Sequence, residues 1–167
     1  MKLYDDLIFI QKNVFDACGL SYTAAVIETE SAEYSACQFR LEDQLVQYRL
    51  AKITPTKNGQ FVTLWKRKLK GPIQPFDVSD KIDVVIVNVI KNNHRGIFVF
   101  PAETLVKQDI FSVNNKGGKR AMRVYPPWDL AESKQAEKTQ KWQLDYFLET
   151  PHSKSVNIQK CNSLIEK

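Results

Sequence analysis

The sequence predicts an α/β protein of the α+β kind, with a mixed central β-sheet flanked by helices. Its 167 residues, 43% of them hydrophobic, are enough for one domain with a full core. The stretch 82–90, IDVVIVNVI, is apolar at nearly every position, which is typical of a strand covered on both faces. The order helix, several strands, helix, strand, helix also favours a sheet between helical layers. We expect residues 1–150 to form a single domain, and the polar segment 151–167 has no predicted structure.

The first element is an amphipathic helix over residues 3–18. Asp5 and Asp6 lie in its first turn, where acids are favourable, and Gly19 is placed to end it. Its apolar positions recur at helical spacing: Leu3, Leu7, Ile10, Val14 and Cys18.

Four strands follow, rich in β-branched and aromatic residues. They are TAAVIE (23–28), ACQFRL (36–41), LVQYRLAKI (45–53) and QFVTLWKR (60–67). Asn58-Gly59, just before the fourth strand, is a strong hairpin signal. Because Pro55 fixes its own φ and lacks a donor, we expect an irregular turn between Thr54 and Asn58.

The second half of the chain continues the sheet and adds helices. After a loop at 71–75, the buried strand 82–90 is followed by GIFVFP (96–101), a short helix at 102–107 and a last strand, RAMRVYP (120–126). A long helix is predicted over about 130–148. Asp129 and Glu132 resemble a capping box at its start, and Trp142 and Tyr146 are spaced to stack on each other.

Several classes of site are disfavoured by composition. The cysteines, Cys18, Cys37 and Cys161, are odd in number and far apart, so neither a disulfide framework nor a zinc site is indicated. With His94 and His152 as the only histidines, a metal would have to sit on carboxylates. No long uncharged apolar run suggests a membrane span, and the acidic N-terminal segment is unlike a signal peptide. We expect a cytoplasmic protein with no membrane partner.

Positive charge is concentrated in two stretches. Residues 49–70 hold seven of the 24 cations and no acid, and residues 116–123 form a second acid-free cluster. Local fields of this kind favour polyanions. The sequence therefore predicts nucleic acid, DNA or RNA, as the partner.

The predicted contacts lie in the hairpin and in the loop of the second cluster, residues 116–123, which we call the basic loop. The turn offers hydroxyls, free N–H groups and a lysine to phosphates, the loop glycines permit close backbone approach, and tryptophans beside cations are suited to stacking. The candidates are Lys52, Thr54, Lys57, Gln60, Trp65, Lys66, Arg67, Lys116, Lys119, Arg120, Arg123 and Trp128. The competing interpretations are a solvated hairpin tip, a core tryptophan and a mobile surface loop.

Lys52 has two interpretations. In a regular strand it shares a face with Val46, Tyr48 and Leu50, and a lysine turned into a cleft needs a carboxylate or a bound phosphate. A bend before Pro55 would instead turn it outward.

Three ordered motifs resemble one family of bacterial proteins, the MepB family. They are K-x-T-P-T-K-x-G-Q-F-V-T-x-W-K-R at 52–67, G-K-R-x-x-R-V-Y-P-P-W at 118–128 and T-Q-x-W-Q-x-x-Y-F at 139–147. The likeness spans roughly residues 20–148. It implies a restriction-endonuclease-like αβα sandwich and a suggested role in nucleic-acid binding.

Nucleases of that fold hold Mg²⁺ on acids beside a lysine of a (D/E)-x-K strand motif. Here the only such triplet is Glu132-Ser-Lys134, which lies on a predicted helix. Glu33 or Asp83 with Lys52 are the alternative catalytic candidates, and Glu30 is a further acid near the second strand.

The leading hypothesis is a DNA- or RNA-binding protein without a cofactor. A degenerate metal-dependent nuclease, which alone would need Mg²⁺, is the first alternative. An adaptor that binds an acidic protein or an anionic metabolite is the second. Strandedness, base specificity and oligomeric state stay open.

Overall fold

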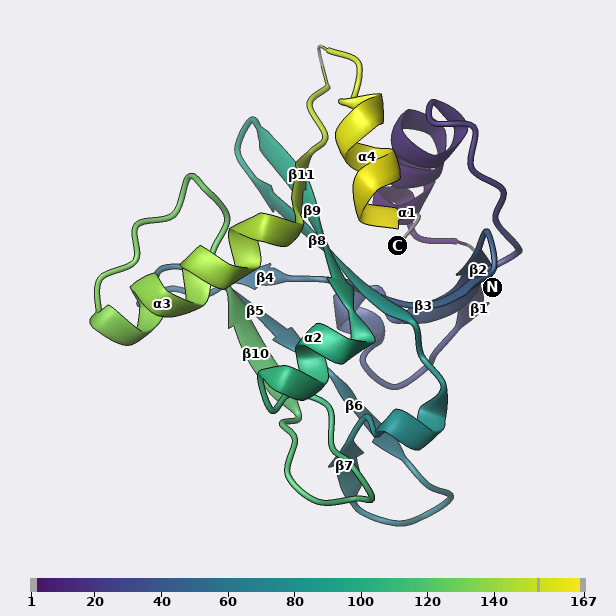
Figure 1. Ribbon diagram of the computed structural model, residues 1–167, viewed down its shortest axis with the longest axis vertical. Helices are drawn as coiled ribbons and strands as arrows, with labels where there is room; N and C mark the ends of the chain where they lie inside the picture. The colour runs from purple at the N-terminus through teal and green to yellow at the C-terminus, as the bar shows by residue number, and fades with distance from the viewer. Residues whose placement is uncertain (1–2, 153, 166–167) are drawn as a thin grey trace.

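A six-stranded mixed sheet forms the centre of the protein in a computed structural model that describes residues 3–152 and 154–165 (Figure 1). The parallel pair is β3 with β8, and all other neighbours are antiparallel. The predicted α+β fold with a mixed sheet is confirmed. In spatial order the strands are β1 (Val26–Ile27), β2 (Cys37–Leu41), β3 (Gln44–Leu50), β8 (Val84–Lys91), β9 (His94–Pro101) and β11 (Phe147–Glu149).

Helices cover one face of this sheet. The first helix is confirmed: α1 (Asp5–Ile10) continues into a π-helical segment, η1 (Gln11–Asp16), and Gly19, with φ +68°, follows its end. Beside it lies α4 (Ile158–Ile165), in the segment for which the sequence predicted no structure. Both pack on β3 and β8 through a shared apolar core, to which α4 contributes Cys161, Leu164 and Ile165.

The opposite face is covered by helical segments and by a second, smaller sheet that the sequence did not indicate. Its strand order is β10 (Ala121–Val124), β5 (Gln60–Thr63) and β4 (Lys52–Ile53), and α2 (Ala102–Lys107) packs beside it. Alternate residues of the small sheet point inward, so that Val62 and Val124 are fully buried against the central strands. The apolar run 82–90 is thus covered on both faces, as expected.

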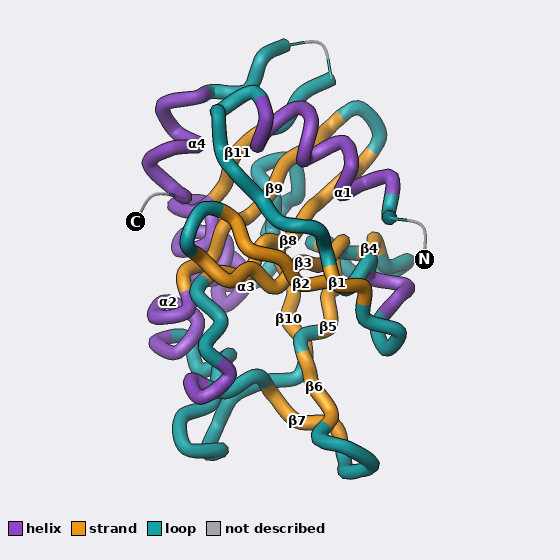
Figure 2. The backbone as a smooth tube through the Cα atoms, turned by 90° about the vertical axis from the view of Figure 1, so that its right-hand side faces the viewer, coloured by secondary structure: helices purple, strands orange, loops and turns teal. Residues whose placement is uncertain are grey.

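A two-stranded arm extends from the small sheet. Here β6 (Trp65–Arg67) continues the direction of β5 and pairs with β7 (Ile73–Pro75), before the short η3 (Val78–Asp80). Figure 2 shows this β6–β7 arm, residues 65–75, projecting from the body. The sequence predicted a loop at 71–75. Proline lacks an N–H donor, but Pro75 is tolerated because β7 is an edge strand.

The last predicted helix is shorter than expected. α3 (Lys134–Gln143) begins after Ser133, whose Oγ accepts a hydrogen bond from Ala136 N at 3.0 Å, so Asp129 and Glu132 do not form its cap. The chain then passes through η4 (Leu144–Tyr146) into β11. Trp142 and Tyr146 both contact Phe100, with ring centroids 5.4 and 6.1 Å away. Within the described ranges, no helix has the length and apolarity that a membrane crossing requires.

Candidate nucleic-acid interface

The two basic stretches of the sequence meet in the small sheet. β10 pairs antiparallel with β5, so that Arg123 lies opposite Phe61 and Ala121 opposite Thr63. The pairing continues past the strands, since Leu64 N donates to Arg120 O at 2.9 Å. We call the small sheet with its adjoining segments 54–59 and 116–120 the basic ribbon. Neighbouring strands lie about 5 Å apart, so folding places Lys52 and Arg123, one from each basic stretch, on either side of Phe61.

The outer face of the ribbon carries a cross-strand row of Lys52, Phe61 and Arg123. The guanidinium of Arg123 lies 5.9 Å from the Phe61 ring centroid, and Lys52 Nζ lies 4.8 Å from that of Tyr34. β3 ends at Leu50, and Lys52 belongs to the other sheet. The bend that the sequence left open is therefore present, and Lys52 does not extend the face of Val46 and Tyr48.

Arg123 organises the turn before β5. It donates to Thr54 Oγ1 at 2.8 Å and to Asn58 O at 3.2 Å, while Asn58 Nδ2 donates to Leu130 O at 2.9 Å. The irregular turn is thus fixed from within the chain. The Arg123 guanidinium and the Thr54 hydroxyl are thus hydrogen-bonded to each other. Lys57 is the exposed cation of this turn.

Gln60 faces the interior. Only 1% of it is exposed, and its Nε2 donates to Ile90 O at 3.5 Å. It is therefore not available to a macromolecular ligand, which corrects its inclusion in the predicted interface.

Three glutamates in residues 28–33, which we call the glutamate segment, supply counter-charges to the acid-free stretch 49–70. Glu33 accepts from Lys52 at 2.8 Å, Glu30 from Arg67 at 2.8 Å, and Glu28 from Arg49 at 3.2 Å. Sequence reasoning missed this arrangement. The three acids lie close together in the sequence, which is a signal that was present, but their partners are 19 to 37 residues away.

The pairs differ in burial. Lys52 and Arg67 remain 42% and 36% exposed at the side chain, so their ion pairs are solvated surface contacts. Arg49 is only 1% exposed, and burial lowers its pKa while the Glu28 carboxylate counteracts that shift. Gln47 Nε2 donates to the same carboxylate oxygen. A further pair joins Lys66 to Asp80 at 2.6 Å, largely out of solvent.

The basic loop is held in place by two carboxylates. Asp109 Oδ1 accepts from Gly118 N at 2.9 Å, and Asp77 Oδ1 accepts from Asn115 N at 2.9 Å. Asp77 is buried, and its hydrogen bonds from the Ser112 hydroxyl and from the backbone N–H groups of Ser79 and Asn115 lower its pKa. Lys116, Lys119 and Arg120 are exposed, and no ion pair involves them within residues 3–152 and 154–165.

Both candidate tryptophans are already engaged. The Arg67 guanidinium lies 5.7 Å from the Trp65 ring centroid. Trp128 stacks on His94, with centroids 5.0 Å apart and an interplanar angle of 14°, and its edge meets Phe147. Each is half-buried, and each ring already has a partner over one of its faces.

The catalytic candidates do not assemble into a magnesium site. Asp83 accepts from Leu45 N at 2.8 Å, at the start of the parallel strands, whereas Lys52 follows their ends. Lys52 comes seven positions after Leu45, which is roughly 23 Å of chain if it is fully extended. Glu33 is the one candidate acid beside Lys52, and in the described part of the chain no three His, Cys, Asp or Glu side chains are grouped to hold a metal ion. The residues present therefore do not fit the ion that the nuclease alternative needs.

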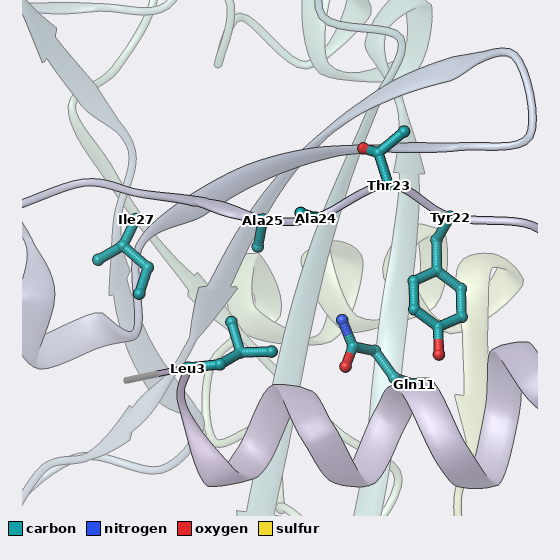
Figure 3. A pocket seen from close by; sticks show the side chains of 7 residues that line it. All are labelled: Leu3, Gln11, Tyr22, Thr23, Ala24, Ala25 and Ile27. Carbon is teal, nitrogen blue, oxygen red and sulfur yellow. The ribbon is translucent and has the colours of Figure 1, made fainter. Parts of the chain in front are cut away.

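Two pockets lie outside the ribbon. One, of about 260 Å³, lies between α1 and the extended segment 22–27 and is lined by residues such as Leu3, Gln11 and Ala25 (Figure 3). The other, of about 410 Å³, lies between residues 127–131 and Glu137 and Gln140 of α3. The first pocket has no charged side chain in its lining, so it offers no recognition of an anion.

The fold and the site together define an α+β protein with a mixed central sheet and a basic ribbon on one face. The chain belongs to the MepB-like family, whose model matches residues 28–149. A solved structure described as the crystal structure of MepB is 36% identical, with a TM-score of 0.76 over 90% of this chain and 99% of that one. No curated protein gives a significant match.

A bacterial homing endonuclease, I-Ssp6803I, is a more distant structural neighbour. It is 13% identical, with a TM-score of 0.47 over 83% of this chain and 88% of that one. Similarity at this level carries no argument about activity.

Proposed function

We propose that this chain is a cytoplasmic protein that binds nucleic acid, with DNA as the first candidate, through the outer surface of the basic ribbon. The observation that carries the proposal is the antiparallel β5–β10 pairing, which places the turn bearing Lys57 at one end of the ribbon and the segment bearing Lys119 and Arg120 at the other. These exposed cations have no intramolecular carboxylate partner among the described residues. Unpaired cations at both ends of one ribbon are suited to separate phosphates along a nucleic-acid chain.

The cations that are paired with the glutamate segment should contribute less to binding. Lys52 and Arg67 lie on the same ribbon and its arm, but each is shared with a carboxylate. A phosphate reaches them only by competing with Glu33 or Glu30. The main contribution to affinity is therefore assigned to Lys57, Lys116, Lys119 and Arg120.

Fluorescence anisotropy with labelled duplex DNA, single-stranded DNA and RNA, measured over a range of salt concentrations, tests the proposal. Because each phosphate contact releases condensed counterions, log Kd should rise steeply with log salt concentration. Lys57→Ala, Lys119→Ala and Arg120→Ala should each weaken binding and lower the slope by about one.

The matched control is Lys12→Ala. Lys12 is an exposed lysine on η1, in the layer on the opposite face of the central sheet, so its loss should leave affinity unchanged. Affinity that is absent at low salt, or insensitive to salt, contradicts the proposal. Equal competition by heparin and by nucleic acid of the same charge favours an adaptor for generic polyanions instead.

A further inference from the structure

The tip of the β6–β7 arm carries a leucine that does not contribute to the hydrophobic core. Leu69 is 95% exposed and has φ +52°. Gly71 N donates to Lys68 O at 2.9 Å, which makes residues 68–71 a tight turn with Leu69 at its second position. Turns with positive φ at that position prefer Gly, Asn or Asp. A bulky side chain there is unfavourable for both the backbone and solvation, which points to a role in binding.

The base of the arm is held by several polar contacts. Arg67 Nη1 donates to Gly71 O at 2.9 Å, and its Nε donates to Glu30. Lys66 is anchored to Asp80, and Trp65 pairs with Pro75. These contacts hold the tip away from the body (Figure 2), so that Leu69 is presented together with its exposed neighbours Lys68 and Lys70.

The arm is continuous with the proposed interface. β5 runs into β6 after a single residue, and Gly118 of the basic loop lies so close to β7 that a Cβ there would be 2.8 Å from Pro75 Cβ. The Lys66 and Arg67 charges behind the tip are already paired with acids, whereas no ion pair in the described ranges involves Lys68 or Lys70. Positive charge therefore extends from the ribbon to the tip.

We infer that the tip of the β6–β7 arm is a wedge for double-stranded DNA: Leu69 enters the minor groove and partly unstacks a base step, while Lys68 and Lys70 contact the phosphates on either side. Apolar wedges flanked by cations are a recurrent way for proteins to kink a duplex. A single leucine is too small an apolar surface to hold the protein on a membrane. The wide, shallow minor groove of an RNA helix offers less to a narrow tip than that of B-form DNA.

This inference rests on the proposed function, and its test separates the two. We would bind the full chain to duplex DNA labelled at both ends for energy transfer, and to a duplex that contains 2-aminopurine, whose fluorescence rises on unstacking. The central variant is Leu69→Asn, because asparagine tolerates the left-handed conformation and should preserve the turn. Circular dichroism and thermal unfolding check that preservation.

We expect wild-type protein to shorten the end-to-end distance and to raise 2-aminopurine fluorescence. Leu69→Asn should abolish both signals and weaken binding roughly ten-fold, about the value of burying one leucine. Lys68→Ala and Lys70→Ala should each lower the salt slope by about one. Val26→Asn, at a valine that is 69% exposed on β1, is the matched control and should change nothing.

Salt-dependent binding by wild type, together with unchanged affinity and bending in Leu69→Asn, would overturn the wedge and leave the proposed function intact. Binding to duplex without any bending or unstacking by wild type would overturn it equally. Absence of nucleic-acid binding at low salt would overturn both proposals.

Discussion

Arg123 Nη2 donates to Thr54 Oγ1 at 2.8 Å, which links two segments that are 69 residues apart in the chain. The same side chain donates to Asn58 O. One cation of the second basic cluster therefore shapes the turn of the first, so part of the positive charge that the sequence assigns to ligand binding is used to build the surface.

Replacing Arg123 with methionine should loosen the 54–59 turn. The change removes a charged donor of several hydrogen bonds, so we expect a loss of about 1 kcal/mol in unfolding free energy. Backbone amides around Gly59 should also exchange faster with deuterium, which hydrogen-exchange mass spectrometry measures. Arg120→Met is the control, since Arg120 is exposed and has no side-chain hydrogen bond to another of the described residues. Equal exchange in both variants would show that Arg123 has no organising role.

Neutralising the glutamate segment should strengthen nucleic-acid binding. Glu33→Gln frees Lys52, Glu30→Gln frees Arg67, and both changes remove repulsion of phosphate. We expect roughly a three-fold gain in affinity for each, together with a steeper salt dependence. Glu103→Gln, at an exposed glutamate on α2, should have no effect. Weaker binding by Glu33→Gln would mean that this carboxylate takes part in ligand recognition.

The Glu28–Arg49 pair should contribute to stability through the buried guanidinium. Removing one partner of a fully buried pair costs about 3–5 kcal/mol. Because Glu28 is 36% exposed, we expect roughly 2 kcal/mol for Glu28→Ala in urea unfolding. In an Arg49→Met background the same substitution should cost less, because only the hydrogen bond from the buried Gln47 amide to Glu28 is then lost. An equal cost in both backgrounds would show that the pair is not coupled.

Asp77 should make stability depend on acid pH. Hydrogen bonds from the Ser112 hydroxyl and two backbone amides lower its pKa in the folded state, so the unfolded state binds more protons at low pH. Its contribution is complete above the ordinary carboxyl pKa of about 4 and declines as pH falls toward the lowered value. Unfolding free energies between about pH 6 and pH 3 should fall less steeply with acid in Asp77→Asn than in wild type. Parallel curves would contradict this.

Cys37 should resist alkylation in the folded protein. Burial raises the pKa of its thiol to about 12, so almost no thiolate exists at about pH 8. Iodoacetamide followed by peptide mass spectrometry should modify the half-exposed Cys18 first and Cys37 only after denaturant is added. Rapid labelling of Cys37 in the native protein would show that β2 opens readily.

Much of the fold was predictable because its signals are local. The spacing of Leu7, Ile10 and Val14 gave the first helix, and the run 82–90 gave the strand that is buried on both faces. The elements that were missed depend on partners: β7 exists because β6 pairs with it, and β11 because Gly96 leaves room for the Phe147 ring, which lies 2.2 Å from where a Cβ would be. α4 gains its stability from burial against α1 and the sheet.

The sequence by itself determined the α+β class, the family and the presence of two acid-free basic stretches, because periodicity, motif order and composition are properties of the chain. Only the tertiary structure decided which cations face solvent unpaired. Lys52 pairs with Glu33, 19 residues away, and Arg67 pairs with Glu30, 37 residues away. Gln60 is buried, and Asp83 lies at the end of β3 and β8 that is opposite to Lys52. Ion pairing depends on distances of a few ångströms, and strand register fixes those distances only when the chain has folded.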